Sequence, residues 1–205
     1  MKPFVVGITG CSGSGKTFLL KKLLESFDSK DISVLSMDNY YKPVEEQVRD
    51  ENGVIHFDLP GSIDEAKFED DIRTLINGDS IEITEYTFNV LDREPSMIKI
   101  EPKPLIVVEG IFAFTYKGVN QLLDMKVFVD SPEEVMLQRR IKRDEAERGY
   151  HDRSVRYRFE QHVLPIYREH VLPLRSTADY IIDNAVDPLK DLNEVIAELK
   201  KQVSR

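Results

Sequence analysis

One glycine-rich octapeptide near the N-terminus constrains the fold of this chain more than any other feature. It fits the pattern GxxxxGKT, follows the apolar run FVVGIT and precedes the helical run FLLKKLLESF. In that setting, backbone N–H groups can surround phosphate oxygens, and the N-terminal end of the next helix adds positive potential. We therefore expect a loop that binds the phosphates of ATP through Gly10, Cys11, Ser12, Gly13, Ser14, Gly15, Lys16 and Thr17.

Two side chains of this loop are expected to act directly on the nucleotide. Lys16 would reach the terminal phosphates, and the Thr17 hydroxyl would bind magnesium. A strand-to-helix turn that carries Lys-Thr by coincidence is the alternative, which the flanking pattern disfavours. We expect Cys11 to be a small packing residue without a catalytic role.

Hydrophobic periodicity predicts the fold class. Short apolar runs at residues 3–9, 32–37, 105–108, 126–129 and 180–182 alternate with segments of helical period. One helix should begin at a capping box of Ser62 and Glu65 and end at Gly78. A second should begin at Ser131, with Pro132 at its first position, and the last helix should begin after Asp187. This alternation is typical of a three-layer α/β fold of the P-loop nucleoside triphosphate hydrolase type, with a mostly parallel sheet.

The length favours a single domain over residues 1–205, because 205 residues with 41% hydrophobic content suffice for one core and not two. Residues 79–104 read as shorter strands and turns punctuated by prolines. We expect this stretch to form a small β-rich insertion on the substrate side of the sheet.

Charge and cysteine content restrict the partners. The net charge is −9, which argues against general binding of nucleic acid or of anionic membranes, so a small molecule is the expected partner. The single cysteine excludes an intramolecular disulfide, and the start of the chain lacks the layout of a signal peptide. We expect a soluble cytoplasmic protein.

Two acidic residues follow apolar strands and should meet at the carboxyl edge of the sheet. Glu109 ends LIVVE and is expected to serve magnesium, and Asp38 ends ISVLSMD and is expected to accept the proton of an attacking hydroxyl. Asp38 is also a candidate metal ligand. The alternative for each is an ordinary strand-end or turn residue.

Residues 139–158 form the most basic segment of this acidic chain, with eight basic against four acidic residues. Arg139 and Arg143 are four residues apart and share a helix face, and Gly149 permits a turn after them. We expect an arginine-rich lid over the ATP phosphates, since guanidinium groups suit phosphate oxygens. A solvated helix with internal ion pairs is the alternative.

Two other classes of nucleotide-binding protein remain as minor alternatives. Asp58-Leu59-Pro60-Gly61 matches the DxxG of GTPase switches, but no NKxD or TKxD motif follows downstream. An ATPase that drives the movement of a partner would leave Asp38 and the basic segment unexplained.

A series of motifs resembles the uridine kinase branch of the phosphoribulokinase/uridine kinase family. In order, they are GCSGSGKT, SMDNYYKP, HFDLPGSID, EYTFNVLDR, VVEGI, RRIKRDEAERG and ADYIID, and together they span most of the chain. The resemblance implies transfer of a phosphoryl group from ATP, with Mg²⁺, to a nucleoside 5′-hydroxyl, most simply that of uridine or cytidine. It also suggests a homo-oligomer.

The same resemblance implies roles for individual residues. Asp38 would be the general base, while Lys16, Arg143 and Arg148 would stabilise the transferring charge. Asp58 and Arg140 would contact the ribose hydroxyls, with Tyr41 near the substrate. The residues expected around the pyrimidine base are Tyr86, Phe88 and Arg93.

Two departures from the family pattern leave the acceptor open. Thr87 and Leu91 stand where the family usually has aspartate and histidine, and the loss of hydrogen-bonding groups from a base pocket alters discrimination. A kinase of a different nucleoside, of pantothenate or of a sugar phosphate remains an alternative. A sugar phosphate would require extra basic residues beside Asp38, where the sequence offers Lys42 and Arg49.

Overall fold

A five-stranded parallel sheet organises the computed structural model, which describes residues 2–87 and 95–203. The strand order is β2-β5-β1-β6-β7, and each neighbouring pair is parallel. The strands are β1 (Phe4–Thr9), β2 (Ile32–Ser36), β5 (Leu105–Glu109), β6 (Met125–Asp130) and β7 (Tyr180–Asp183). All five coincide with the expected strands, so the predicted mostly parallel sheet is confirmed.

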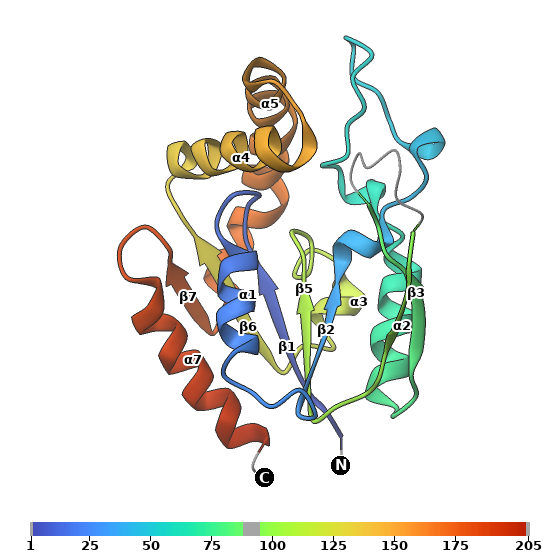
Figure 1. The fold of residues 1–205 in the computed structure, drawn as a ribbon, viewed down its shortest axis with the longest axis vertical. Helices are drawn as coiled ribbons and strands as arrows, with labels where there is room; N and C mark the ends of the chain where they lie inside the picture. The colour runs from blue at the N-terminus through green and yellow to red at the C-terminus, as the bar shows by residue number, and fades with distance from the viewer. Residues whose placement is uncertain (1, 88–94, 204–205) are drawn as a thin grey trace.

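Helices cover both faces of the sheet, as Figure 1 shows. On one face, α1 (Lys16–Leu24) and α7 (Pro188–Val203) pack their buried leucines against β1, β5 and β6. On the other face lie α2 (Glu65–Ile76) and α3 (Lys117–Asn120). The layers are therefore helix, sheet and helix, which confirms the predicted three-layer architecture.

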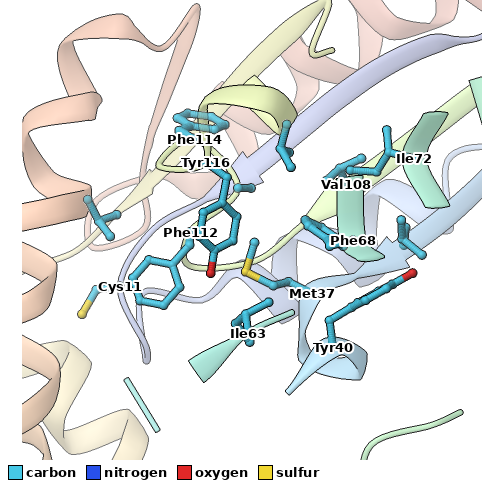
Figure 2. Packing of buried hydrophobic residues seen from close by; sticks show 14 of the residues in the cluster. Cys11, Met37, Tyr40, Ile63, Phe68, Ile72, Val108, Phe112, Phe114 and Tyr116 are labelled. Atoms are coloured by element: carbon cyan, nitrogen blue, oxygen red, sulfur yellow. The ribbon is translucent and has the colours of Figure 1, made fainter. Parts of the chain in front are cut away.

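The larger of the two apolar cores lies on the face of the sheet that α2 covers. Met37, Phe68 and Phe112 are fully or almost fully buried there (Figure 2). Cys11 belongs to the same buried cluster, although it is part of the glycine-rich loop. The core thus extends directly beneath the expected phosphate site.

A helical arm crosses the carboxyl edge of the sheet before the chain returns to β7. It begins with α4 (Glu133–Arg148) and α5 (Asp152–Arg158), which Figure 1 shows beyond the ends of the central strands. Gly149 ends α4 with a φ of 67°, in the left-handed region that glycine adopts readily. The arm continues as π-helical turns at Phe159–Val163 and Tyr167–Val171, α6 (Leu164–Ile166) and a 3₁₀ segment at Leu172–Thr177.

A two-stranded hairpin lies beside the main sheet, within the stretch expected to be a β-rich insertion. It pairs β3 (Ile81–Thr84) antiparallel with β4 (Met97–Ile100). Ile81, Ile83 and Ile100 are buried in the larger core, which anchors the hairpin. Three residues singled out from the sequence, Phe88, Leu91 and Arg93, lie outside the described residues.

Two predicted helix starts are wrong in detail. The cap of α2 is Asp64, whose Oδ1 accepts a hydrogen bond of 3.0 Å from the Lys67 amide. Ser62 cannot cap the helix, because it is buried in a 3₁₀ turn (Pro60–Ser62) and its hydroxyl donates to the His56 carbonyl. Pro132 precedes α4 with an extended ψ of 142° and is not in its first turn. Pro188, in contrast, begins α7 as expected.

Short 3₁₀ turns follow β2, at Met37–Tyr40 and Val44–Glu46. Across the part of the chain that the structure describes, no helix combines the length and the apolar character that crossing a membrane would require.

Candidate active site

A cavity of about 560 Å³ opens at the carboxyl ends of β1, β2 and β5. The helices α4 and α5 close one side of it, and the loop that follows β2 closes another. Most of the described residues that the sequence pointed to line this single cavity: Ser12, Gly13, Gly15, Lys16, Thr17, Asp38, Tyr41, Asp58, Tyr86, Glu109, Arg140, Arg143 and Arg148.

The glycine-rich loop forms one end of the cavity and has no room for a side chain at Gly13 or Gly15. Gly13 has a φ of +85°, and a Cβ placed on it would lie 2.3 Å from the Met136 carbonyl oxygen in α4. Gly15 has a φ of +103°, and its Cβ would collide with the Asn184 amide. Lys16 curls over the loop and donates to the carbonyls of Gly10 and Cys11, at 3.1 and 3.2 Å. Gly10, Cys11 and Ser14 also belong to the loop, but they are not among the described residues that line the cavity.

The loop is held in shape from outside by two residues that the sequence did not single out for this role. The Asn184 side chain donates to the Ser14 carbonyl at 2.7 Å. Arg139 donates to the same carbonyl at 3.3 Å, to the Ser131 hydroxyl at 3.1 Å and to the Asn184 carbonyl at 3.0 Å. Arg139 therefore braces the phosphate loop, whereas the sequence grouped it with the lid arginines.

Asp38 and Glu109 lie together near the Lys16 ammonium, which is 4.0 Å from a Glu109 carboxylate oxygen. Burial raises the pKa of both carboxyls above their ordinary values, and the charge of Lys16 opposes this rise. The Ser36 hydroxyl donates to Glu109 at 3.3 Å and accepts from the Asp38 amide at 3.4 Å. Carboxylate and hydroxyl oxygens are the ligands that Mg²⁺ prefers, so these acids with Thr17 could hold that ion.

Three arginines of α4 form ion pairs with one buried carboxylate, that of Asp144. Asp144 accepts from Arg143 at 2.8 Å and forms ion pairs with Arg140 at 3.3 Å and Arg148 at 3.6 Å. Arg140 also approaches Asp58 at 3.6 Å. Asp144 was not singled out from the sequence, although its position four residues after Arg140 and four before Arg148 places all three on one helix face.

Aromatic rings line the other end of the cavity. The ring of Tyr41 lies 5.9 Å from that of Phe57 and 5.1 Å from that of Tyr86, and the Tyr86 amide donates to the Asn39 side chain at 3.0 Å. Burial, followed by the charges of Asp38 and Asp58, raises the pKa of the Tyr41 hydroxyl well above its ordinary value. The cavity therefore joins a phosphate-binding end to an end with aromatic rings and acids.

Four residues that line this second end were not singled out from the sequence: Val44, Ile55, Phe57 and Val155. Arg158, which also lines the cavity, belongs to the basic segment at residues 139–158. Thr87, which was noted as a departure from the family pattern, also lines the cavity. Phe57 had a signal, since it immediately precedes Asp58. The others lie on a loop and on α5, where no local pattern distinguishes a cavity wall from a packed surface.

Comparisons with known proteins agree on one family. A family profile described as "Phosphoribulokinase / Uridine kinase family" matches residues 5–190. Uridine-cytidine kinase B of Dictyostelium discoideum is 30% identical over 98% of this chain and 83% of its own length. A uridine kinase of Clostridium perfringens strain SM101 is 29% identical over 100% of this chain and 98% of its own length.

Solved structures share the fold at low sequence identity. Phosphoribulokinase from Rhodobacter spheroides superposes with a TM-score of 0.66 at 16% identity, over 89% of this chain and 70% of that one. A possible uridine kinase from Bacillus stearothermophilus gives a TM-score of 0.58 at 18% identity, over 88% of this chain and 89% of that one. These likenesses establish the P-loop kinase fold.

Proposed function

The chain belongs to the phosphoribulokinase/uridine kinase family, and on this premise we propose that it transfers the γ-phosphoryl group of ATP to the 5′-hydroxyl of uridine or cytidine. The observation that carries the proposal is that Asp38 lines one cavity together with the phosphate loop and the aromatic rings, and that it lies near both Lys16 and Tyr41. A nucleotide bound at one end and a nucleoside at the other would meet at this carboxylate.

Asp38 is the proposed general base. The acceptor oxygen forms a bond to the γ-phosphorus, the bond from that phosphorus to the β–γ bridging oxygen breaks, and ADP leaves with the electron pair. The proton of the hydroxyl passes to a carboxylate oxygen of Asp38. A carboxyl whose pKa is raised by burial is a stronger base than one in water, which suits this transfer.

Cations around the cavity stabilise the charge that moves between the two substrates. The positive charges of Lys16, Arg148 and Arg143 oppose the rise of the Asp38 pKa, so all three lie near the carboxylate at which transfer would occur. Thr17, Glu109 and Asp38 are the proposed residues for Mg²⁺, which when bound would neutralise charge on the phosphate oxygens. Binding ATP phosphates would give the lid arginines a second anionic partner besides Asp144.

The acceptor is proposed from the relatives and from the cavity wall together. Asp58 and Arg140 are the proposed partners of the ribose hydroxyls, because one offers a hydrogen-bond acceptor and the other a donor, and the two lie 3.6 Å apart. Tyr41 and Tyr86 offer ring faces to a pyrimidine base. Phe88 and Arg93 remain predictions for the same base.

Other acceptors have less support. A sugar phosphate needs a second anion site, and neither Lys42 nor Arg49 is among the described residues that line the cavity. Arg49 donates instead to the Gly53 carbonyl at 2.8 Å. Asp58, which begins the GTPase-like DxxG, pairs with Arg140 inside the cavity and so fits a substrate role better than a switch role. A cytoplasmic location and a homo-oligomeric state remain predictions from the family.

The test is Asp38→Asn, assayed with Mg-ATP and uridine or cytidine. Loss of a general base should lower kcat by about 10²–10⁴-fold, while the Kd for ATP measured without Mg²⁺ should stay within about twofold. Glu45→Gln is the matched control, because it removes an exposed carboxylate outside the described cavity lining. Near-normal turnover by Asp38→Asn would show that another group accepts the proton.

A further inference from the structure

The loop at residues 50–58 lies against the helical arm, because Asp50 and Asn52 both form hydrogen bonds with Tyr157. It contributes Ile55, Phe57 and Asp58 to the cavity wall. Its backbone folds back on itself, with a bridge between Arg49 and Ile55 and a hydrogen bond of 2.8 Å from the His56 amide to the Val48 carbonyl. The shape of this loop therefore sets where three wall residues lie.

Asp50 is the centre of the hydrogen bonds that hold the loop. Its Oδ1 accepts from the backbone amides of Asn52 at 2.9 Å and Val54 at 2.8 Å, which closes the loop. Its Oδ2 accepts from the Tyr157 hydroxyl at 2.6 Å and contacts His162 Nε2 at 2.8 Å, which joins the loop to the arm. The hydrogen bond from Tyr157 is the main reason that the pKa of Asp50 lies below its ordinary value.

The arm contributes to the wall of the cavity through α5, the helix that carries Tyr157. In α5, Val155 and Arg158 line the cavity, while Tyr157 between them reaches Asp50 and accepts from the Asn52 side chain at 2.7 Å. Asp50, Tyr157 and His162 are themselves absent from the described residues that line the cavity. They join its two walls without reaching into it.

A metal site beside this loop, formed by His56, Asp58 and His162, is a poorer explanation of why these side chains lie together. One nitrogen each of His56 and His162 and one oxygen of Asp58 lie within 4.8 Å of one another. However, the two rings stack at 4.0 Å with an interplanar angle of 11°. The lone pairs of imidazole lie in the ring plane, so two parallel rings direct them side by side rather than toward one ion, whereas a tetrahedral site requires them to converge.

We propose that Asp50, Tyr157 and His162 form a latch that fixes the 50–58 loop against the helical arm and thereby positions Phe57 and Asp58 for the acceptor. The inference rests on the proposed function in taking a nucleoside as the acceptor. The three are positioning residues. Loosening the latch should therefore weaken acceptor binding, while the phosphate loop, which is held by Arg139 and Asn184, keeps its affinity for ATP.

The test compares Tyr157→Phe and Asp50→Asn with Tyr180→Phe, which removes a hydroxyl on β7, away from the latch. Asp50→Asn keeps a side-chain oxygen that can accept from the amides of Asn52 and Val54, but it removes the negative charge that faces Tyr157 and His162 on the arm. Each latch variant should raise the KM for uridine or cytidine about fivefold to tenfold, as expected for one lost hydrogen bond, with the Kd for ATP within twofold. Tyr180→Phe should change neither value.

Hydrogen exchange of the ligand-free protein gives a second readout that is independent of the acceptor. The amides of Val54 and His56 should exchange faster in both latch variants, while those of β1 and β5 stay unchanged. An unchanged acceptor KM together with unchanged exchange would refute the latch. Equal losses of acceptor binding, ATP binding and melting temperature would refute the positioning role. If the wild type phosphorylates no nucleoside, the proposed function fails, and faster loop exchange would still support the latch.

Discussion

Replacing Asp144 by asparagine should destabilise the protein strongly while leaving the shape of the site intact. The Asp144 side chain is 3% exposed, and that of its partner Arg140 is 9% exposed. Removing one member of a buried ion pair costs about 3–5 kcal/mol, because the remaining charge stays buried. We expect the lower end, about 3 kcal/mol, because Arg143 and Arg148 still reach solvent and Arg140 keeps Asp58 as a partner at 3.6 Å. For a domain of this size, that corresponds to a melting temperature lower by about 6–12 °C.

Thermal unfolding followed by circular dichroism, with and without Mg-ATP, measures this effect. The phosphates would supply negative charge to the arginines that lose Asp144, so Mg-ATP should raise the melting temperature of the variant more than that of the wild type. Glu145→Gln is the matched control, since Glu145 is the exposed neighbour on the same helix. A decrease below about 2 °C, or one equal to that of the control, would refute the reasoning.

Three further predictions concern the phosphate loop. Lys16→Ala should weaken ATP binding by at least about tenfold and lower kcat, since a charge-assisted contact to phosphate is lost; calorimetry and steady-state kinetics would measure both, and unchanged values would contradict the phosphate site. Burial raises the pKa of Cys11 to about 12, so iodoacetamide at pH 8 should label the unfolded protein only, as mass spectrometry would show. Gly13→Ala should cost about 2–4 kcal/mol of stability and abolish ATP binding, because the added Cβ would meet the Met136 carbonyl oxygen. Gly78 also has a positive φ, of +97°, but has open space around it, so the control Gly78→Ala should lower stability and keep ATP binding.

The features that could be predicted from the sequence are those set by local patterns. The octapeptide and the apolar strands specify a phosphate loop after β1, and parallel strands necessarily bring Asp38 and Glu109 to one edge. The caps of α2 and α4 were less predictable. Ser62 and Asp64 are both good capping residues, and the tertiary contact of Ser62 with the His56 carbonyl decides which one caps α2.

The features that could not be predicted depend on contacts between distant residues. Asp50 and Tyr157 are 107 residues apart, yet their hydrogen bond fixes the loop that carries Phe57. Arg139 shares a helix face with Arg143, but the position of β7 brings Asn184 within its reach and so makes it a brace of the phosphate loop. Such roles follow from packing between elements and leave no mark on local sequence periodicity.

The measurement that tests the central claim most directly is product formation from Mg-ATP with uridine or cytidine as the only acceptor. The purified protein should form ADP and the nucleoside 5′-monophosphate in equal amounts, and Asp38→Asn should form neither at a comparable rate. Consumption of ATP that is independent of any nucleoside, with no monophosphate formed, would contradict the account.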